Sequence, residues 1–566
     1  MTDPIDRRTL LGRGVAAGLG LATAGGLGGL LEACSSGPGQ PTAATAPARR
    51  SRDGVSTAAP RRGGQIVFGN EAEDNSMDPA SAQWDESGIN YARTVYDPLT
   101  IVAADGTVKP YLAATVTADA DYTTWTITAR PNVVFHDGSI CDAPAIANSM
   151  NHYLTGLLGT VSKGPIQSIK ATDARTVTVS MSQPWSSFDY YLAGGVGGQI
   201  GYVIAPSVIA ASKASTTAFI RPVGTGPFVF SDWVQNDHFT AVRNLHYWRR
   251  GLPYLDQITF RPIVDSDSRS SSLQAATIDI MHDSASPTVL QYRDNLAYNY
   301  VDDLHQTIGE PDMGCLLLNF SKPPFDDLRA RQALAHAIDQ KTYKRVIAKG
   351  VNPIADQPFV PGSRFYAPVD YPQYDPAAAR ALVTDYQRDK GPLTFALGTV
   401  AGSALAIQSA QFLQQNFTAV GIHCTIAQVQ QDEVISNALT GRYQALGWRQ
   451  FGAVDPDLNY IFWSPTTIFA SLGEAADMTR NPDPRIQAAL IKGRTAGDAP
   501  TRDQAYQEVA KLFAEDLPYI WLGRAIWCVV ARSNVQNFDN PTAPDGSRAY
   551  GMFVGTIFPA EVWVSA

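Results

Sequence analysis

The sequence lacks the short motifs that carry the commonest catalytic chemistries. Its 566 residues contain no GxSxG, HExxH, Walker A or SxxK pattern, which mark serine hydrolases, zinc proteases, nucleotide hydrolases and penicillin-binding enzymes. The nearest approach to a phosphate-binding loop is Gly194-Gly195-Val196-Gly197-Gly198. It lacks the preceding strand and following helix of a dinucleotide site, so we expect a flexible loop there. These absences favour a binding protein over an enzyme.

Metal-binding patterns and paired cysteines are also missing. None of the eight histidines lies three or four residues from another, although zinc sites commonly use such pairs. We interpret His136 beside Asp137 as a turn, and Asp455-Pro456-Asp457 lacks the spacing and glycine of an EF-hand loop. We therefore predict neither a metal nor a cofactor. The remaining cysteines, Cys141, Cys315, Cys424 and Cys528, are scattered and form no CxxC pattern. Export permits disulfides, but Cys315 and Cys424 lie in apolar strand-like runs, where we expect buried free thiols.

Long apolar runs are absent except near the amino terminus. Arg7-Arg8 precede an apolar stretch, Val15 to Leu31, which ends in Leu31-Glu32-Ala33-Cys34. A charged start, an apolar middle and a small residue before the break are typical of an export signal. The stretch is short and weakly hydrophobic for a transmembrane helix. The arginine pair resembles a Tat signal, and the cysteine resembles the lipidated residue of a lipoprotein. We predict an export signal over 1–33 and lipidation at Cys34, with an ordinary Sec signal as the alternative.

Aromatic residues are absent from the segment that follows. Gly, Pro, Ala, Ser, Thr and Arg dominate residues 34–64, and such a segment cannot bury enough apolar surface to fold. As a random coil of about thirty residues it would span ~30 Å. The whole chain carries −9, the tether +4 and the signal no net charge, which leaves −13 on the body. We predict a disordered tether, and the acidic body argues against a nucleic-acid partner.

The body of about five hundred residues exceeds a single core, so we expect two or more lobes. Apolar and polar residues alternate from Trp125 to Ala129 and from Val177 to Met181, and this pattern predicts two half-buried strands. Leu393 to Leu397 predicts another strand, followed by a helix that ends at Gly421 and then by a further strand. That order makes a βαβ unit, so one lobe should hold a parallel sheet.

Helix starts are indicated by capping residues. Asp375-Pro376 is an N-cap with proline in the first turn. Asp326-Asp327 should begin a helix that ends near Gly350, and Thr501-Arg502-Asp503-Gln504 fits a capping box. These signals place helices mainly in the second half of the body.

A series of spaced motifs resembles a known family. The motifs are Tyr96-Asp97-Pro98-Leu99-Thr100, Phe135-His136-Asp137-Gly138, Pro222 to Phe228, Asn244 to Trp248, Leu316 to Asn319, Pro323 to Asp327 and Arg331 to Asp339. In this order they resemble the family 5 extracytoplasmic solute-binding proteins of ABC importers, the oligopeptide- and dipeptide-binding group. The resemblance runs from about Gly64 to Leu522.

The resemblance implies an α/β, two-lobed, periplasmic-binding-protein type II fold that closes like a flytrap. Lobe I would have a core at 65–85, 206–311 and 520–566, with an extra subdomain at 86–205. Lobe II would span 312–519, and two crossover strands near Met313 to Asn319 and Ile520 to Val530 would join the lobes. The implied protein is a monomer held at the extracytoplasmic face of the membrane, and it delivers solute to a cognate permease and ATPase.

The resemblance also implies where a ligand binds. In peptide-binding members the ligand lies extended and is held mostly through its backbone. The matching positions are Asn70, Glu71, Glu73, Trp185, Phe188, Trp448, Arg449, Gln450, Phe451, Asp455 and Asp457. An aspartate usually follows the tryptophan of the last segment and pairs with the free amine of the peptide. Here Phe451-Gly452 stands in its place.

This departure leaves two interpretations open. Burying an ammonium without a carboxylate costs several kcal/mol. Either Asp455, Glu71 or Glu73 replaces the missing partner of a peptide amine, or the ligand is a glycoside, an opine or a modified peptide. Nickel chelates, also taken up by the family, are disfavoured by the sparse histidines. Two rivals from other classes are a lipid-anchored hydrolase with an unrecognised site and a regulatory lipoprotein whose cleft is sealed by large side chains.

Overall fold

The computed structural model describes residues 58–565, with gaps at 75, 83, 157–158, 160–162, 196, 214–217, 305–307, 465–467, 470–473 and 476–477. The predicted export signal, Cys34 and nearly all of the predicted tether lie outside the described residues. Within the described part of the chain, no helix combines the length and the apolar character needed to cross a membrane.

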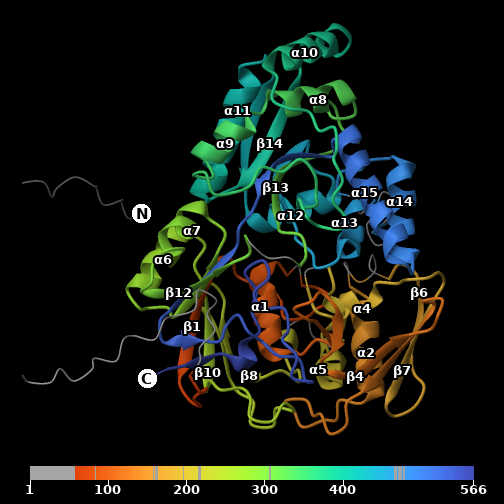
Figure 1. Ribbon diagram of the computed structural model, residues 1–566, viewed down its shortest axis with the longest axis vertical. Coiled ribbons are helices and arrows are strands. Elements are labelled where there is room, and N and C mark those ends of the chain that lie inside the picture. The colour runs from red at the N-terminus through yellow and green to blue at the C-terminus, as the bar shows by residue number, and fades with distance from the viewer. Residues whose placement is uncertain are drawn as a thin grey trace, which may run out of the picture. The chain divides into compact units, whose positions relative to one another are not determined.

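A mixed sheet of seven strands organises the first core (Figure 1). Its order is β12 (Tyr298–Asp302), β20 (Cys528–Arg532), β11 (Ile280–Asp283), β1 (Gln65–Asn70), β10 (Gln257–Pro262), β9 (His238–Arg243) and β8 (Phe228–Val234). β1 pairs in parallel with both β10 and β11. Phe68 and Phe260 pair in register and are buried. α1 (Glu86–Val95) covers this face, because the Tyr91 ring lies 4.8 Å from that of Phe260.

The extra sheet of this half has the order β4 (Ala113–Ala118), β5 (Thr124–Ala129), β7 (Thr176–Met181) and β6 (Ile166–Ala171). The two strands predicted by alternation are confirmed, since Trp125, Ile127 and Ala129 on β5 are buried, as are Val177 and Val179 on β7. Both sheets share one hydrophobic cluster. We call the elements of these two sheets lobe I. Its other helices are α2 (Ala143–Tyr153), α4 (Phe188–Tyr191), α5 (Pro206–Ser212), α6 (Ser266–Gln274) and α7 (Ser286–Tyr292).

A sheet of five strands organises a second cluster, which we call lobe II. Its order is β15 (His423–Val429), β14 (Thr394–Val400), β16 (Ala445–Gln450), β13 (Met313–Leu318) and β19 (Tyr519–Arg524). β14, α11 (Ala404–Thr418) and the parallel β15 form the predicted βαβ unit. The other helices are α8 (Leu328–Ala337), α9 (Gln340–Val346), α10 (Pro376–Lys390), α12 (Gln431–Thr440), α13 (Tyr460–Trp463), α14 (Pro484–Thr495) and α15 (Ala499–Asp516).

Short elements complete the fold. They are the hairpin of β2 (Thr100–Val102) and β3 (Val108–Pro110), the pairs β17 (Ile468–Phe469) with β18 (Glu474–Ala475) and β21 (Val535–Gln536) with β22 (Trp563–Val564), and the 3₁₀ turns η1 (Gln199–Gly201), η2 (Ala218–Ile220), η3 (Pro456–Asn459) and η4 (Pro559–Glu561). Of these turns, η3 contributes Leu458 and Asn459 to the cavity described below.

Two passages join the lobes, one between β12 and β13 and the other at residues 525–527. Trp527 in the second passage donates its indole N–H to Asp312 in the first, at 2.8 Å. β19 belongs to the lobe II sheet, so the return to lobe I follows Arg524 rather than the predicted boundary at 520. The other predicted boundaries between the lobes stay predictions.

Two helix predictions need correction. The helix predicted from Asp327 to near Gly350 is broken into α8 and α9. Asp339 leaves the helical conformation and caps α9, because its carboxylate accepts a hydrogen bond from the backbone N–H of Thr342. The capping box predicted at Thr501 is wrong, since Asp498 caps α15 three residues earlier. The cap of α10 at Asp375 is confirmed. Cys315 and Cys424 are buried free thiols, as predicted, and so are Cys141 and Cys528.

Candidate ligand cleft

A cavity with about 60 Å³ of free space, partly open to solvent, is lined by residues of both lobes. Lobe I contributes Ile89 and Arg93 of α1, residues 193–195 and 197 of the loop after α4, and a carboxyl-terminal segment at 550–558. Lobe II contributes the segment 451–462 after β16. Most of the lining is apolar or aromatic, which is the usual character of a small-molecule site.

α1 holds Arg93 at the cavity. Asp85 caps this helix by accepting hydrogen bonds from the backbone N–H groups of Ser87 and Gly88. Tyr91 packs into the core of lobe I, while Arg93, two residues on, is half-buried at the cavity wall. Its guanidinium donates to Thr556 Oγ1 at 2.9 Å and lies over the Phe558 ring, with Cζ 4.0 Å from the ring centroid.

The glycine-rich loop serves close packing at the cavity. A Cβ on Gly197 would lie 2.3 Å from the Leu458 carbonyl oxygen of lobe II. Gly194 has a φ of +71°, and a Cβ there would lie 2.6 Å from the Tyr202 ring. Gly195 has open space where its Cβ would be. The loop follows α4 and precedes η1, so the prediction that it is not a dinucleotide loop is confirmed.

Phe451 projects from lobe II into the cavity lining. It follows β16 directly and packs against Phe462, with ring centroids 5.3 Å apart, and against Trp448 at 6.1 Å. Gly452 N–H donates to Asp312, which ties this segment to the first passage between the lobes. The predicted departure from a peptide-amine site therefore places an aromatic ring, not a carboxylate, at this wall.

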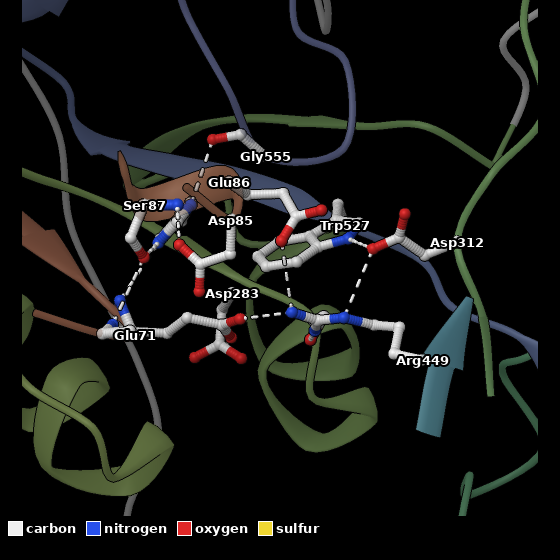
Figure 2. A network of polar contacts seen from close by, with 12 residues as sticks. Glu71, Asp85, Glu86, Ser87, Asp283, Asp312, Arg449, Trp527 and Gly555 are labelled. Atoms are coloured by element: carbon white, nitrogen blue, oxygen red, sulfur yellow. Dashed lines mark hydrogen bonds and ion pairs between the residues drawn. The ribbon is translucent and has the colours of Figure 1, made fainter. Parts of the chain in front are cut away.

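Arg449 joins the lobes through a cluster of carboxylates (Figure 2). Its guanidinium forms ion pairs with Glu71 at 2.7 Å, Glu86 at 3.3 Å and Asp312 at 3.3 Å. It also lies over the Trp527 ring, 4.5 Å from the centroid. The same arginine thus contacts Glu71, which follows β1, and Glu86 of α1 in lobe I, and it also contacts both passages between the lobes.

The carboxylates of this cluster respond to burial and charge in different ways. Burial raises the pKa of Glu86 well above its usual range, and the nearby Asp312 adds to the rise. Burial also raises the pKa of Asp312, against the charge of Arg449. For Glu71 burial acts upward, but Arg449 and other cations lower its pKa below the ordinary value. Within this cluster, Arg449 therefore favours the ionised form of Glu71 most strongly.

Asp455 and Asp457 are paired with arginines of their own lobe. Asp455 accepts two hydrogen bonds from Arg502, one of them at 2.6 Å from Nη1. Asp457 is fully buried and pairs with Arg494 at 2.8 Å. It also accepts hydrogen bonds from Trp185 Nε1 and Ser187 Oγ, both at 2.7 Å. Neither carboxylate lines the cavity.

The remaining predicted ligand residues occupy varied settings. Glu73 accepts hydrogen bonds from Trp233 Nε1 and Asn236 N, away from the Arg449 cluster. Asn70 and Gln450 are fully buried, and Trp185 and Phe188 belong to the lobe I core. Trp448 is half-buried, and its indole N–H has no hydrogen-bond partner. Of the predicted set, the cavity lining includes Phe451. The roles of the others in ligand binding stay predictions.

Sequence reasoning missed Arg93 and the segment 550–558. Arg93 stands in an ordinary amphipathic helix, and residues 550–558 lie about 460 positions further along the chain. No local pattern connects them. The nearest signal was Tyr96-Asp97-Pro98, directly after α1, which is one of the motifs that carry the family resemblance.

One group of carboxylates in the described residues has the spacing of metal ligands. It comprises Glu71, Asp85 and Glu86, and Arg449 already neutralises part of its charge. His136 and Asp137 do not converge on a common point. His136 Nε2 lies 3.0 Å from the Gly226 carbonyl oxygen, while Asp137 accepts hydrogen bonds from Ser139 and Ser207. The two side chains serve a turn, as predicted.

Residues 107–469 match the profile of the bacterial extracellular solute-binding proteins, family 5 Middle. The chain belongs to this family. The glutathione-binding protein GsiB of Pectobacterium atrosepticum is 27% identical over 484 residues, which cover 79% of this chain and 86% of that protein. The nickel-binding periplasmic protein of Escherichia coli is 25% identical over 472 residues, covering 80% and 87%.

Solved structures of family 5 proteins share the fold. AgaA from A. tumefacien R10, in complex with agropinic acid, has a TM-score of 0.78 at 19% identity and covers 89% of this chain and 99% of its own. AppA from Bacillus subtilis, in complex with a nonapeptide, has a TM-score of 0.76 at 19% identity and covers 90% and 100%. The two-lobed periplasmic-binding fold predicted from the motifs is confirmed. These family 5 relatives are named as binding proteins.

Proposed function

We propose that this family 5 protein captures a small solute between its lobes and delivers it to a cognate ABC permease and ATPase. The observation that carries the proposal is the cavity lined by α1, the 550–558 segment and the 451–462 segment, which belong to different lobes. A ligand that contacts both lobes favours the closed state by its differential contacts. The regulatory alternative, a cleft sealed by large side chains, stays a second candidate, because the free space between these walls is about 60 Å³.

We propose a short peptide or peptide-like solute whose amine is not recognised. Relatives are named for glutathione and for peptides, which favours this class. The carboxylates considered as amine partners are already in use: Glu71 pairs with Arg449, Asp455 with Arg502, and Glu73 with Trp233 and Asn236. The described residues lining the cavity include no carboxylate. A buried ammonium would therefore lack a counter-charge, which favours an N-blocked or otherwise amine-free ligand.

The test is a thermal-shift titration with a mixed pool of tri- to pentapeptides and with the same pool N-acetylated. We expect both pools to raise the Tm alike, because the amine has no partner in the cavity. At a hundredfold excess over Kd the stabilisation is ~2.7 kcal/mol. A shift with free-amine peptides alone would mean that a carboxylate rearranges to bind the amine. If neither pool raises the Tm, the peptide assignment falls and the glycoside, opine and modified-solute classes are screened next.

We further propose an exported, lipid-anchored monomer without enzymatic activity or nucleic-acid partner. The extracellular character of the family supports export, and the sequence around Arg7-Arg8 and Cys34 supports a Tat-type lipoprotein signal. A tether of about thirty residues would keep the body within ~30 Å of the membrane. That distance suits a receptor that works beside its permease.

A further inference from the structure

The cavity carries a single kind of charge. Among the described residues that line it, Arg93 is charged and the others are apolar, aromatic or neutral polar. Because an arginine side chain stays protonated in proteins, this wall of the cavity is permanently positive.

The guanidinium of Arg93 uses only part of its hydrogen-bonding capacity within the protein. One Nη donates to Thr556 Oγ1 at 2.9 Å and the other makes a long contact of 3.4 Å with the Gly194 carbonyl oxygen. The Nε–H is shut off from solvent and makes no hydrogen bond of normal geometry, and the buried Tyr202 hydroxyl interacts with the guanidinium. No described carboxylate lies within ion-pair distance of this guanidinium. Burial lowers the pKa of Arg93, as expected for a cation removed from water without a counter-charge.

Other arginines of the protein show what is unusual here. Arg449, Arg494 and Arg502 are each paired with a carboxylate. Arg130 resembles Arg93 more closely, because it too has an unpartnered Nε and lies over a tryptophan ring. Arg130 donates to two backbone carbonyls, Tyr111 O and Ala113 O, and does not line the cavity. An unpaired arginine can thus be structural, and the position of Arg93 at the cavity sets it apart.

We infer that Arg93 binds a carboxylate of the ligand, so that the solute is an organic acid with an apolar body. The inference rests on the proposed function and specifies its ligand. Each Nη group of Arg93 makes a single contact within the protein and keeps a spare N–H donor at the cavity wall, and this end of a guanidinium binds a carboxylate through two hydrogen bonds. The aromatic side chains Phe451, Phe462, Phe553 and Phe558 provide the surface for an apolar body.

The experiment compares the affinities of the full-length protein, in mild detergent, for one tripeptide pool in four chemical forms. The amino end is free or acetylated, and the carboxyl end is an acid or an amide. We expect the acid forms to bind and the amides to bind ten- to a hundredfold more weakly, since a hydrogen bond to a charged group contributes about 1.5–3 kcal/mol. Acetylation should change little. Arg93→Gln should remove the preference for the acid, and Arg93→Lys should retain part of it.

Arg130→Gln is the matched control. It removes an equally unpaired guanidinium from the same lobe. We expect it to change the Tm of the ligand-free protein but not the ratio of the affinities for the acid and amide forms of the peptides. The ratio is measured on the unmodified protein first, so that a poorly folded Arg93 variant does not decide the result.

The outcomes separate this inference from the proposed function. If acid and amide forms bind equally, or if Arg93→Gln keeps the acid preference, the carboxylate assignment is overturned while the receptor function stands. If no peptide form binds, the peptide assignment fails, and phenylpropionate and its amide serve as the next matched pair. Binding of the acid alone supports Arg93, and the absence of any preference overturns it.

Discussion

At the scale of single residues, His282 shows how completely the region beside the cavity is fixed. Its Nε2 accepts the Glu71 backbone N–H at 3.0 Å, so its Nδ1–H donates to the Gly555 carbonyl oxygen at 3.1 Å. The ring is fully buried between Phe68 and Trp527. This arrangement requires the neutral imidazole. Burial lowers its pKa to about 4, and Arg269 and Arg449 oppose the raising effect of Glu71.

His282 should therefore make stability fall on acidification. Between its ordinary pKa of 6.5 and the folded value of about 4, the unfolded chain takes up a proton that the folded chain does not. The contribution is fully present above 6.5 and is lost as the pH falls towards 4, by about 3 kcal/mol. Urea unfolding of the wild type and His282→Gln at several pH values should show a steeper loss in the wild type. Parallel curves would contradict the prediction.

At the scale of elements, the start of α15 shows how local signals compete. Asp498 and Thr501 are both good capping residues, and the sequence suggested Thr501. In the structure the Asp498 carboxylate accepts a hydrogen bond from Thr501 N at 2.9 Å. Ala499-Pro500 then form the first turn, where proline is tolerated because its missing N–H would have no partner in the helix. The earlier start lengthens the helix beside α14 (Figure 1).

Substitution at the two positions distinguishes them. Asp498→Ala removes the carboxylate that caps the helix and should lower the Tm by roughly 1 °C in a protein of this size. Thr501→Ala should have the smaller effect, because its backbone N–H, and not its side chain, receives the cap. Thermal melts followed by circular dichroism measure both. A larger loss with Thr501→Ala would restore the capping box that the sequence suggested.

At the scale of the whole molecule, Arg449 joins the two lobes through its ion pairs. It extends from β16 of lobe II to Glu71 and Glu86 of lobe I and to Asp312 between them. Glu86 and Asp312 are fully buried. Their charges are tolerable only with a cation beside them, because an uncompensated buried charge costs several kcal/mol.

Arg449→Met should consequently destabilise the protein by about 3–5 kcal/mol at neutral pH. The deficit should shrink on acidification, because the raised pKa values of Glu86 and Asp312 let them take up protons as the pH falls. Urea unfolding at neutral and mildly acidic pH measures both effects. Arg485→Met is the control, since that arginine is exposed and its ion pairs with Asp483 and Glu515 should contribute little. Equal losses in the two variants would refute the role of Arg449.

Sequence by itself determined the local elements and the family. The alternation of Trp125, Ile127 and Ala129 and the order of strand, glycine-ended helix and strand around Gly421 are short-range patterns. They follow from burying one face of a strand or helix, and the structure confirms them. Capping was predictable at Asp375 but not at Thr501, because two equivalent residues stood three positions apart.

Only the tertiary structure decided what the cavity offers to a ligand. The sequence placed Phe451 where an amine partner was expected, but it could not show that Asp455 and Glu71 are held by Arg502 and Arg449. Nor could it bring Arg93 beside Thr556, about 460 residues away. Ion pairing and cavity lining depend on which distant side chains meet when lobes pack together. That meeting is set by the packing of whole sheets and helices, which leaves no periodic trace in the sequence.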